Sequence, residues 1–201
     1  MGDVNESYSY WTFGDVFEEQ GVPFTPFHGG FGLVANGCIT KPTFWTFAFY
    51  KKLEESEANC VYKDDNIVVL KRANGDYLGV AWNIARKSTE QGKEKMLWEF
   101  TFPAEQEEYC FLTKTVDEET CNPLKVWHDM GEPANLSEEK TKLIRESSRP
   151  FVKTERKKQE DGNICVELPV NENGVVYFEL NAGKVNPDRG YDYDRVVSLK
   201  A

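Results

Sequence analysis

The chain has 201 residues, of which 40% are hydrophobic, 29% charged and 13% aromatic. This length suffices for one or two domains with a sizeable core, and the composition is that of a globular rather than a disordered or collagen-like protein. The formal net charge is −10, because 34 Asp and Glu outnumber 24 Lys and Arg. An acidic chain is not attracted to phosphate, so we expect neither nucleic acid nor a membrane as a partner.

Targeting and cofactor signals are missing from the sequence as given. The first ten residues have neither the basic nor the apolar region of a signal peptide, which predicts a cytoplasmic location. The five cysteines are odd in number and form no C-x-x-C pair, so free thiols are expected, with a Cys110–Cys121 bridge as the alternative. His28 and His128 lack the spacing of metal ligands. We therefore expect no cofactor and no metal.

The first 55 residues are predicted to form a strand, a long loop and a helix. Small polar and aromatic residues alternate over Ser7–Phe13, which indicates a strand. Glycine and proline are frequent from Gly14 to Cys38, and structureless loops of this length are usually functional. Thr40 or Lys41 can cap a helix with Pro42 in its first turn, and an aromatic-rich apolar face extends this helix to about Glu55.

From Cys60 onward the pattern favours β-structure. Residues alternate with period two in five segments: 66–71, 77–85, 95–102, 109–116 and 163–168, and a sixth strand is expected at 175–180. Turn signals at 74–76 and 173–174 join two pairs of them. Short strands with such turns predict a mainly β fold, an antiparallel β-sandwich. The tryptophans at 82, 98 and 127 are expected to pack on or beside its strands.

Three further segments complete the organisation. Ser137 can cap a short helix that ends before Pro150, with two acids in its first turn. The charged residues 153–162 are predicted to be a connection rather than an element. The tail from Lys184 either packs its tyrosines on a neighbouring surface or extends away from the sandwich.

The loop after the first strand concentrates the side chains that a sugar site requires. Aromatic rings cover the apolar face of a sugar, and carboxylates accept hydrogen bonds from its hydroxyls. The candidate substrate-binding residues are Trp11, Phe17, Glu18, Glu19 and His28. The alternative is that the aromatic side chains are core, that the acids lie in a solvated loop, and that His28 only fixes the loop through a hydrogen bond.

This same region resembles a known family. Residues 10–19 read YWTFGDVFEE, residues 27–33 read FHGGFGL, and Lys41-Pro42 opens an aromatic-rich helix. The succession is similar to the end of the catalytic barrel in glycoside hydrolase family 39, the β-xylosidases and their α-L-iduronidase relatives, with Gly14 where serine is usual. Residues 122–150 resemble the accessory β-sandwich of that family more weakly.

The resemblance implies a division of the chain into three parts. Residues 1–57 would be the last strand, loop and helix of a (β/α)8 TIM barrel, 58–183 the accessory β-sandwich, and 184–201 a tail. Active sites of this barrel lie at the carboxyl ends of its strands. Glu18 and Glu19 would then line the subsite for the non-reducing xylose, with Trp11 and Phe17 shaping the pocket.

The family's two catalytic carboxylates have no counterpart among these residues, so no catalytic residue is assigned in this chain. Retaining glycosidases need two carboxyl groups about 5–5.5 Å apart, and adjacent residues of an extended segment point to opposite sides. We therefore expect a C-terminal fragment of a bacterial xylan 1,4-β-xylosidase that is inactive alone. Its partners would be xylose or xylo-oligosaccharides and the missing N-terminal barrel portion, and its exposed aromatic patch predicts self-association or docking on the sandwich.

Two other functions stay open. The chain could be a self-standing, non-catalytic β-sandwich module that binds carbohydrate or a protein. It could also be α-L-iduronidase-like, although 11–31 contains no Lys or Arg to bind a uronate carboxylate. An export signal in a missing N-terminal portion is likewise compatible with the sequence.

Overall fold

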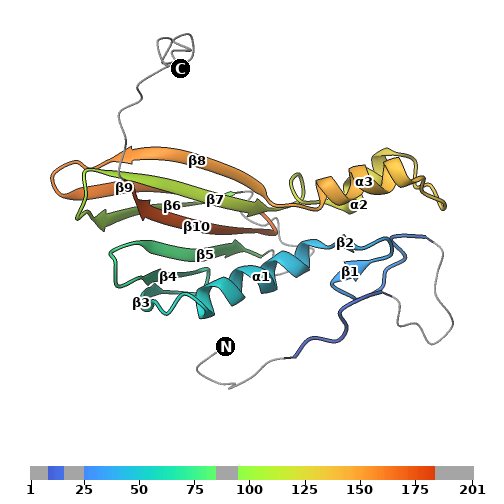
Figure 1. The fold of residues 1–201 in the computed structure, drawn as a ribbon, viewed down its shortest axis with the longest axis horizontal. Coiled ribbons are helices and arrows are strands. Elements are labelled where there is room, and N and C mark those ends of the chain that lie inside the picture. The colour runs from blue at the N-terminus through green and yellow to red at the C-terminus, as the bar shows by residue number, and fades with distance from the viewer. Residues whose placement is uncertain (1–8, 16–24, 85–94, 184–201) are drawn as a thin grey trace, which may run out of the picture.

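The fold consists of two packed β-sheets with one helix on their outer side and a small helical unit at one end (Figure 1). The structure, a computed structural model, describes residues 9–15, 25–84 and 95–183. The helices are α1 (Pro42–Glu54), α2 (Pro123–Asp129) and α3 (Glu138–Ser147). The strands are β1 (Val34–Ala35), β2 (Ile39–Thr40), β3 (Asn59–Lys63), β4 (Ile67–Lys71), β5 (Tyr77–Asn83), β6 (Lys95–Pro103), β7 (Glu108–Val116), β8 (Phe151–Lys158), β9 (Asn163–Asn171) and β10 (Gly174–Ala182).

The larger sheet has six antiparallel strands in the order β3-β4-β5-β10-β7-β8. The second sheet is the antiparallel pair β6–β9, which packs over one face of the first. Strand β9 alternates regularly, and its inward residues Ile164, Val166, Leu168 and Val170 are buried in a core shared with β4, β5, β7 and β10. The predicted antiparallel β-sandwich is confirmed.

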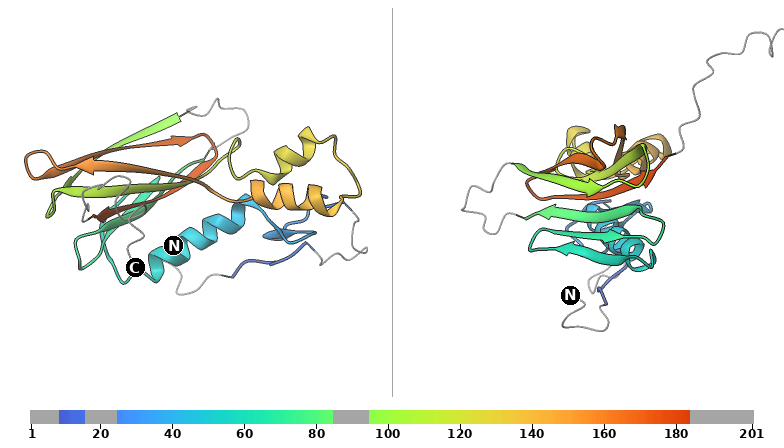
Figure 2. Two further views of the ribbon diagram at one scale, coloured as in Figure 1. Left: turned by 45° about the horizontal axis from the view of Figure 1, so that its top comes forward. Right: turned by 90° about the vertical axis from the view of Figure 1, so that its left-hand side faces the viewer.

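Helix α1 covers the other face of the six-stranded sheet (Figure 2). Its Phe49 and Leu53 are buried against Leu78, Val80 and Tyr177 of the central strands, and the Phe49 and Tyr177 rings stack 5.3 Å apart. Pro42 stands in the first turn, as predicted, because a proline there forfeits no helical hydrogen bond. The helix thus joins the sandwich to the segment that precedes it.

Helices α2 and α3 lie at one end of the sandwich, beside the β1–β2 pair (Figures 1 and 2). Ala35, Ile39, Trp127 and Ile144 form a third buried cluster there. Ser148 connects this unit to its surroundings, since its carbonyl accepts hydrogen bonds from Thr40 Oγ1 at 3.3 Å, Trp45 Nε1 at 2.6 Å and Cys121 Sγ at 3.1 Å. One buried carbonyl therefore ties β2, α1 and the loop after β7 to the end of α3.

Most elements fall where the sequence predicts them, including α1, the β4–β5 and β9–β10 hairpins, and the helix capped by Ser137. All five cysteines are free, as expected. Strand β3 was not predicted. The residues of the tail from Lys184 lie outside the described part of the chain.

Three sequence predictions are wrong. Residues 9–13, the described part of the predicted strand Ser7–Phe13, are not a strand, because their contact with the loop ends in a single parallel bridge, which joins Gly14 to Val34. The charged residues 153–158 are not a connection but belong to β8, an edge strand, where charges are typical because they discourage pairing with other chains. Trp127 lies on helix α2 rather than on a strand; its packing role is confirmed by its burial.

No helix in the described ranges is long and apolar enough to cross a membrane.

Glycine at position 79 is required where β4, β5 and β10 pack most closely. A Cβ at Gly79 would lie 2.4 Å from the Val68 carbonyl oxygen and 2.5 Å from the Phe178 ring. Because backbone cannot move aside in a central strand, we expect Gly79→Ala to lower the free energy of unfolding by about 1–3 kcal/mol or more. Urea unfolding measures this loss. Gly183→Ala is the control, since its Cβ would meet only the Glu108 carbonyl at 4.0 Å, and equal losses in both variants would contradict the prediction.

Candidate functional site

The candidate site begins where residues 12–15 run beside the glycine-rich loop. Leu33 N donates to Thr12 O at 3.1 Å, and Val34 N donates to Phe13 O at 2.9 Å. Asp15 N in turn donates to Val34 O at 2.9 Å. Three consecutive backbone contacts therefore hold the aromatic segment against the end of the loop that leads into β1.

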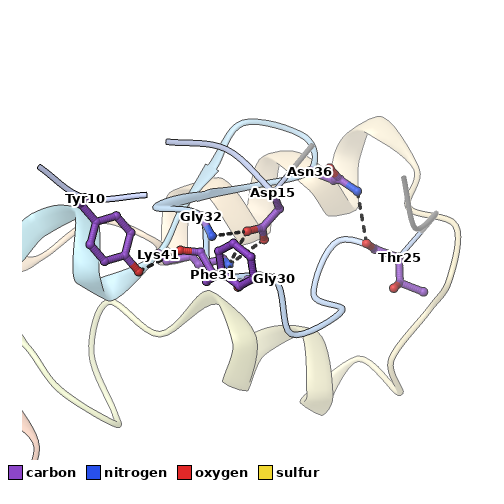
Figure 3. A network of polar contacts seen from close by, with 8 residues as sticks. All are labelled: Tyr10, Asp15, Thr25, Gly30, Phe31, Gly32, Asn36 and Lys41. Carbon is purple, nitrogen blue, oxygen red and sulfur yellow. Dashed lines mark hydrogen bonds and ion pairs between the residues drawn. The ribbon is translucent and has the colours of Figure 1, made fainter. Parts of the chain in front are cut away.

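A buried ion pair between Asp15 and Lys41 lies at the centre of this arrangement (Figure 3). Lys41 Nζ lies 2.6 Å from Asp15 Oδ2 and 2.8 Å from Oδ1, and it donates to the Gly30 carbonyl at 2.6 Å. Asp15 Oδ1 also accepts from Gly32 N at 2.7 Å. The Asp15 side chain is fully buried, and that of Lys41 is 19% exposed. One charge pair thus links the aromatic segment, the glycine loop and the start of α1.

Glycine is needed at positions 30 and 32 because the Asp15 carboxylate and the Gly14 backbone lie very close to them. A Cβ at Gly30 would lie 2.8 Å from the Asp15 carboxylate, and one at Gly32 would lie 2.5 Å from the Gly14 carbonyl carbon. Gly29 adopts φ +84°, in the left-handed region. Loop residues 29–32 are therefore shaped around Asp15 rather than around a phosphate.

Large aromatic side chains on both segments that the ion pair joins are exposed. Trp11 and Phe13 are each 67% exposed, and Phe31 is 59% exposed. Tyr10 is anchored, because its hydroxyl donates to the Phe31 carbonyl at 2.8 Å and its ring packs 5.2 Å from Phe47 of α1 (Figure 3). Within this chain Trp11 and Phe13 are therefore not core residues. Their rings are exposed on an anchored backbone, and sugars stack on exposed aromatic rings of this kind.

Of the five predicted site residues, the structure describes two, Trp11 with its exposed ring and His28. Half-buried His28 lies beside Gly30, with its Cε1 2.9 Å from the position a Cβ there would take, in the glycine loop that Asp15 and Lys41 contact. Phe17, Glu18 and Glu19 lie outside the described residues, so their placement stays a prediction.

The contacts on both sides of residues 16–24 are described. Asp15 is held by Lys41, and the Thr25 carbonyl accepts from Asn36 Nδ2 at 3.4 Å (Figure 3). The segment that carries Glu18 and Glu19 therefore starts and ends at anchored residues.

Sequence reasoning missed Asp15 and Lys41, although a signal was present. Lys41 is the first Lys or Arg of the chain, and five acids precede it. A single cation after such a stretch is the natural partner for an acid that the fold buries. Lys41 was instead considered a cap, but its side chain makes no capping hydrogen bond to α1.

Over residues 9–15, 25–84 and 95–183, no group of three or more His, Cys, Asp or Glu side chains is arranged to hold a metal ion.

Comparison with known proteins identifies the family. The sequence profile of glycosyl hydrolases family 39 matches residues 1–165. The chain belongs to this family. It is 36% identical to a β-xylosidase of Geobacillus stearothermophilus over 179 residues, which are 89% of this chain and 34% of that protein. It is 30% identical to a β-xylosidase of Caldicellulosiruptor saccharolyticus over 88% of this chain and 36% of the relative.

A solved family member shares the fold. The monomeric β-xylosidase of Caulobacter crescentus superposes with a TM-score of 0.73 and 24% identity, covering 89% of this chain and 38% of that one. The chain thus spans about a third of the length of the family 39 proteins that it matches.

Loss of the Asp15–Lys41 ion pair is expected to lower the free energy of unfolding by several kcal/mol. Lys41→Met leaves the Asp15 carboxylate buried without its cation, so we expect the free energy of unfolding to fall by about 3–5 kcal/mol. The double substitution Lys41→Met with Asp15→Asn also removes the unpaired carboxylate charge, so it should recover part of the lost free energy of unfolding. The matched control is Lys51→Met in α1, the helix that Lys41 precedes, because the Lys51–Glu54 pair is exposed and such pairs contribute about 1 kcal/mol or less.

Urea unfolding followed by tryptophan fluorescence measures all three variants. Equal losses for the substitutions of Lys41 and Lys51 would show that the buried pair contributes no more than a surface pair.

Proposed function

We propose that this chain is the C-terminal part of a retaining β-xylosidase that releases xylose from xylo-oligosaccharides. The observation that carries the proposal is its 36% identity to the Geobacillus β-xylosidase over 89% of its length, within family 39. In this assignment residues 1–57 complete a catalytic barrel and residues 58–183 form the accessory sandwich.

The exposed aromatic residues supply the sugar-binding part of the site. The Trp11 ring covers the apolar face of a xylose, and Phe17 shapes the pocket beside it. Glu18 or Glu19 accepts hydrogen bonds from sugar hydroxyls, and His28 borders the same loop. The Asp15–Lys41 pair supports this role, because it holds the backbone on which the rings are mounted.

The catalytic carboxylates come from elsewhere in the polypeptide in this proposal. Retaining hydrolysis needs one carboxyl group to protonate the leaving oxygen and a second to attack the anomeric carbon. Asp15, the described acid closest to the exposed rings in sequence, is buried and bonded to Lys41 and Gly32, so it can do neither. The chain alone is therefore inactive.

The aromatic residues of helix α1 support the proposal that this helix lies between the sandwich and a barrel. Trp45 and Phe49 face the sandwich, whereas Phe47 lies two residues along and so on the opposite side of the helix. A helix with aromatic residues on both sides is typical of one buried between two layers. In the proposed enzyme the barrel packs on the Phe47 side.

One observation favours the alternative function, a carbohydrate-binding module without catalysis. The sandwich has its own closed core, so it satisfies a basic requirement of an independent domain. Calorimetry with xylo-oligosaccharides separates the two functions, because a binding module retains affinity in isolation and an incomplete active site does not. The iduronidase-like alternative gains no support, since Lys41, which contacts the glycine loop, is already paired with Asp15.

Hydrolysis of an aryl β-xyloside tests the main proposal. We expect no nitrophenol release from the purified chain. The longer reading frame upstream of Met1, expressed as one protein, should be active, and Glu18→Gln or Glu19→Gln in it should lower kcat/KM about tenfold or more, as loss of a hydrogen bond to a charged group implies.

Two results would overturn this. Robust release by the 201-residue chain that Glu18→Gln abolishes would place catalysis in the chain itself. A stop codon directly upstream of Met1, together with measurable xylo-oligosaccharide affinity, would favour the binding module.

A further inference from the structure

A groove lies between α1 and the six-stranded sheet, away from the exposed aromatic rings. Its volume is about 240 Å³, and it is open to solvent on one side. Trp45, Phe49 and Lys52 of α1 form one wall, and Lys114 of β7 and Val152 of β8 form the other. Phe47, which packs on Tyr10, is on the opposite side of the helix, so the groove and the candidate sugar site do not share a surface.

The floor of the groove is apolar and fixed. Phe49 is fully buried, and Trp45 is held by the 2.6 Å hydrogen bond from its Nε1 to the Ser148 carbonyl. Val152 is 52% exposed, which leaves an apolar side chain facing the groove from an edge strand. Drug-sized ligands fill pockets of about 300 Å³ or more, so a groove of this size suits a single ring or side chain.

Three cations border this floor. Lys52 and Lys114 face each other, and Arg149 lies at the end near α3. Burial and the neighbouring charge of Lys52 lower the pKa of Lys114. In a chain with a net charge of −10, this is a local concentration of positive charge.

The carboxylate beside these cations is already engaged. Glu179 lies 3.9 Å from Lys52 Nζ, and it also accepts hydrogen bonds from the Tyr177 hydroxyl and from Asn181 Nδ2. Within the described ranges, no carboxylate lies within ion-pair distance of Lys114 or Arg149. Of the three cations, only Lys52 therefore has an acid within ion-pair distance in the described part of the chain, and an anion in the groove would relieve their repulsion.

We propose that this groove binds a carboxylate-bearing sugar, a hexuronate, with the pyranose ring on Trp45 and Val152 and the carboxylate between Lys114 and Arg149. The cations favour an anionic ligand by charge complementarity. The apolar floor favours a ligand that also has a flat apolar face. A pyranose ring has such a face, and a bare inorganic anion does not. Membership of a glycosidase family makes a sugar the fitting occupant. The assignment goes beyond the proposed function and does not depend on xylosidase activity.

Nuclear magnetic resonance titration of the ¹⁵N-labelled 201-residue chain tests the proposal. D-glucuronate should shift the Trp45 indole signal and the Lys114 and Val152 amide signals saturably, whereas D-glucose at the same concentration should not. Lys114→Gln combined with Arg149→Gln should weaken binding about tenfold or more. Retention of all other signals in this variant checks that it folds.

Lys153→Gln is the matched control for Lys114→Gln alone, which should also weaken binding, because each removes one positive charge and Lys153 lies one residue beyond Val152 in β8, on the other face of the sheet. Lys153→Gln should leave binding unchanged. Equal weakening by Lys153→Gln would show that net charge rather than the groove attracts the ligand.

Other outcomes would overturn the proposal in favour of other occupants. Shifts with glucose equal to those with glucuronate would show that the cations do not contribute to binding. Equal shifts with inorganic phosphate would indicate a site for a bare anion. Tighter binding of a tetraglutamate peptide would indicate a protein partner. A Trp45 signal that moves on dilution, or on removal of residues 184–201, would indicate a second copy or the chain's own tail.

Discussion

The Asp15–Lys41 ion pair is the contact on which the arrangement of the N-terminal segment depends. Burying one charge without the other would cost several kcal/mol, so the two side chains must move together. Lys41 is the residue before α1, and α1 is packed on the sandwich through Phe49. The position of the aromatic segment is therefore set by the β-sandwich, through one helix and one ion pair, even though the two regions are far apart in sequence.

This chain of contacts gives the β-sandwich a mechanical role. The Ser148 carbonyl fixes Trp45 and Thr40 at the two sides of the helix start, and the same helix start carries Lys41. Residues from β2, α1 and the loop after β7 meet at that carbonyl, so a shift of the α2–α3 unit would be transmitted to the glycine loop. In the proposed enzyme, the sandwich steadies the end of the barrel that bears Trp11.

The predictable elements are those whose residue pattern reflects burial on one side. Strand β9 has a buried residue at every second position from Ile164 to Val170, and a period of two is visible in any sequence. Strand β8 is an edge strand with mainly charged, exposed residues, so its sequence contains no such period. Helix α2 did carry a readable signal, since the Asn122 side chain accepts from Lys125 N and Pro123 stands in the first turn, but seven residues provide little periodicity.

The residue types of the candidate site were predictable from the sequence, but the ion pair that holds the segment in place was not. Aromatic residues followed by acids are recognisable from the sequence, whereas the pairing of Asp15 with Lys41 joins residues 26 positions apart and depends on the tertiary path. The structure also separates two kinds of cation that look alike in sequence. Lys41 meets a buried carboxylate that belongs to the fold, so its charge is neutralised and its role is structural. Of Lys52, Lys114 and Arg149, only Lys52 has a carboxylate within ion-pair distance in the described ranges, and the proposed ligand would neutralise the remaining charge.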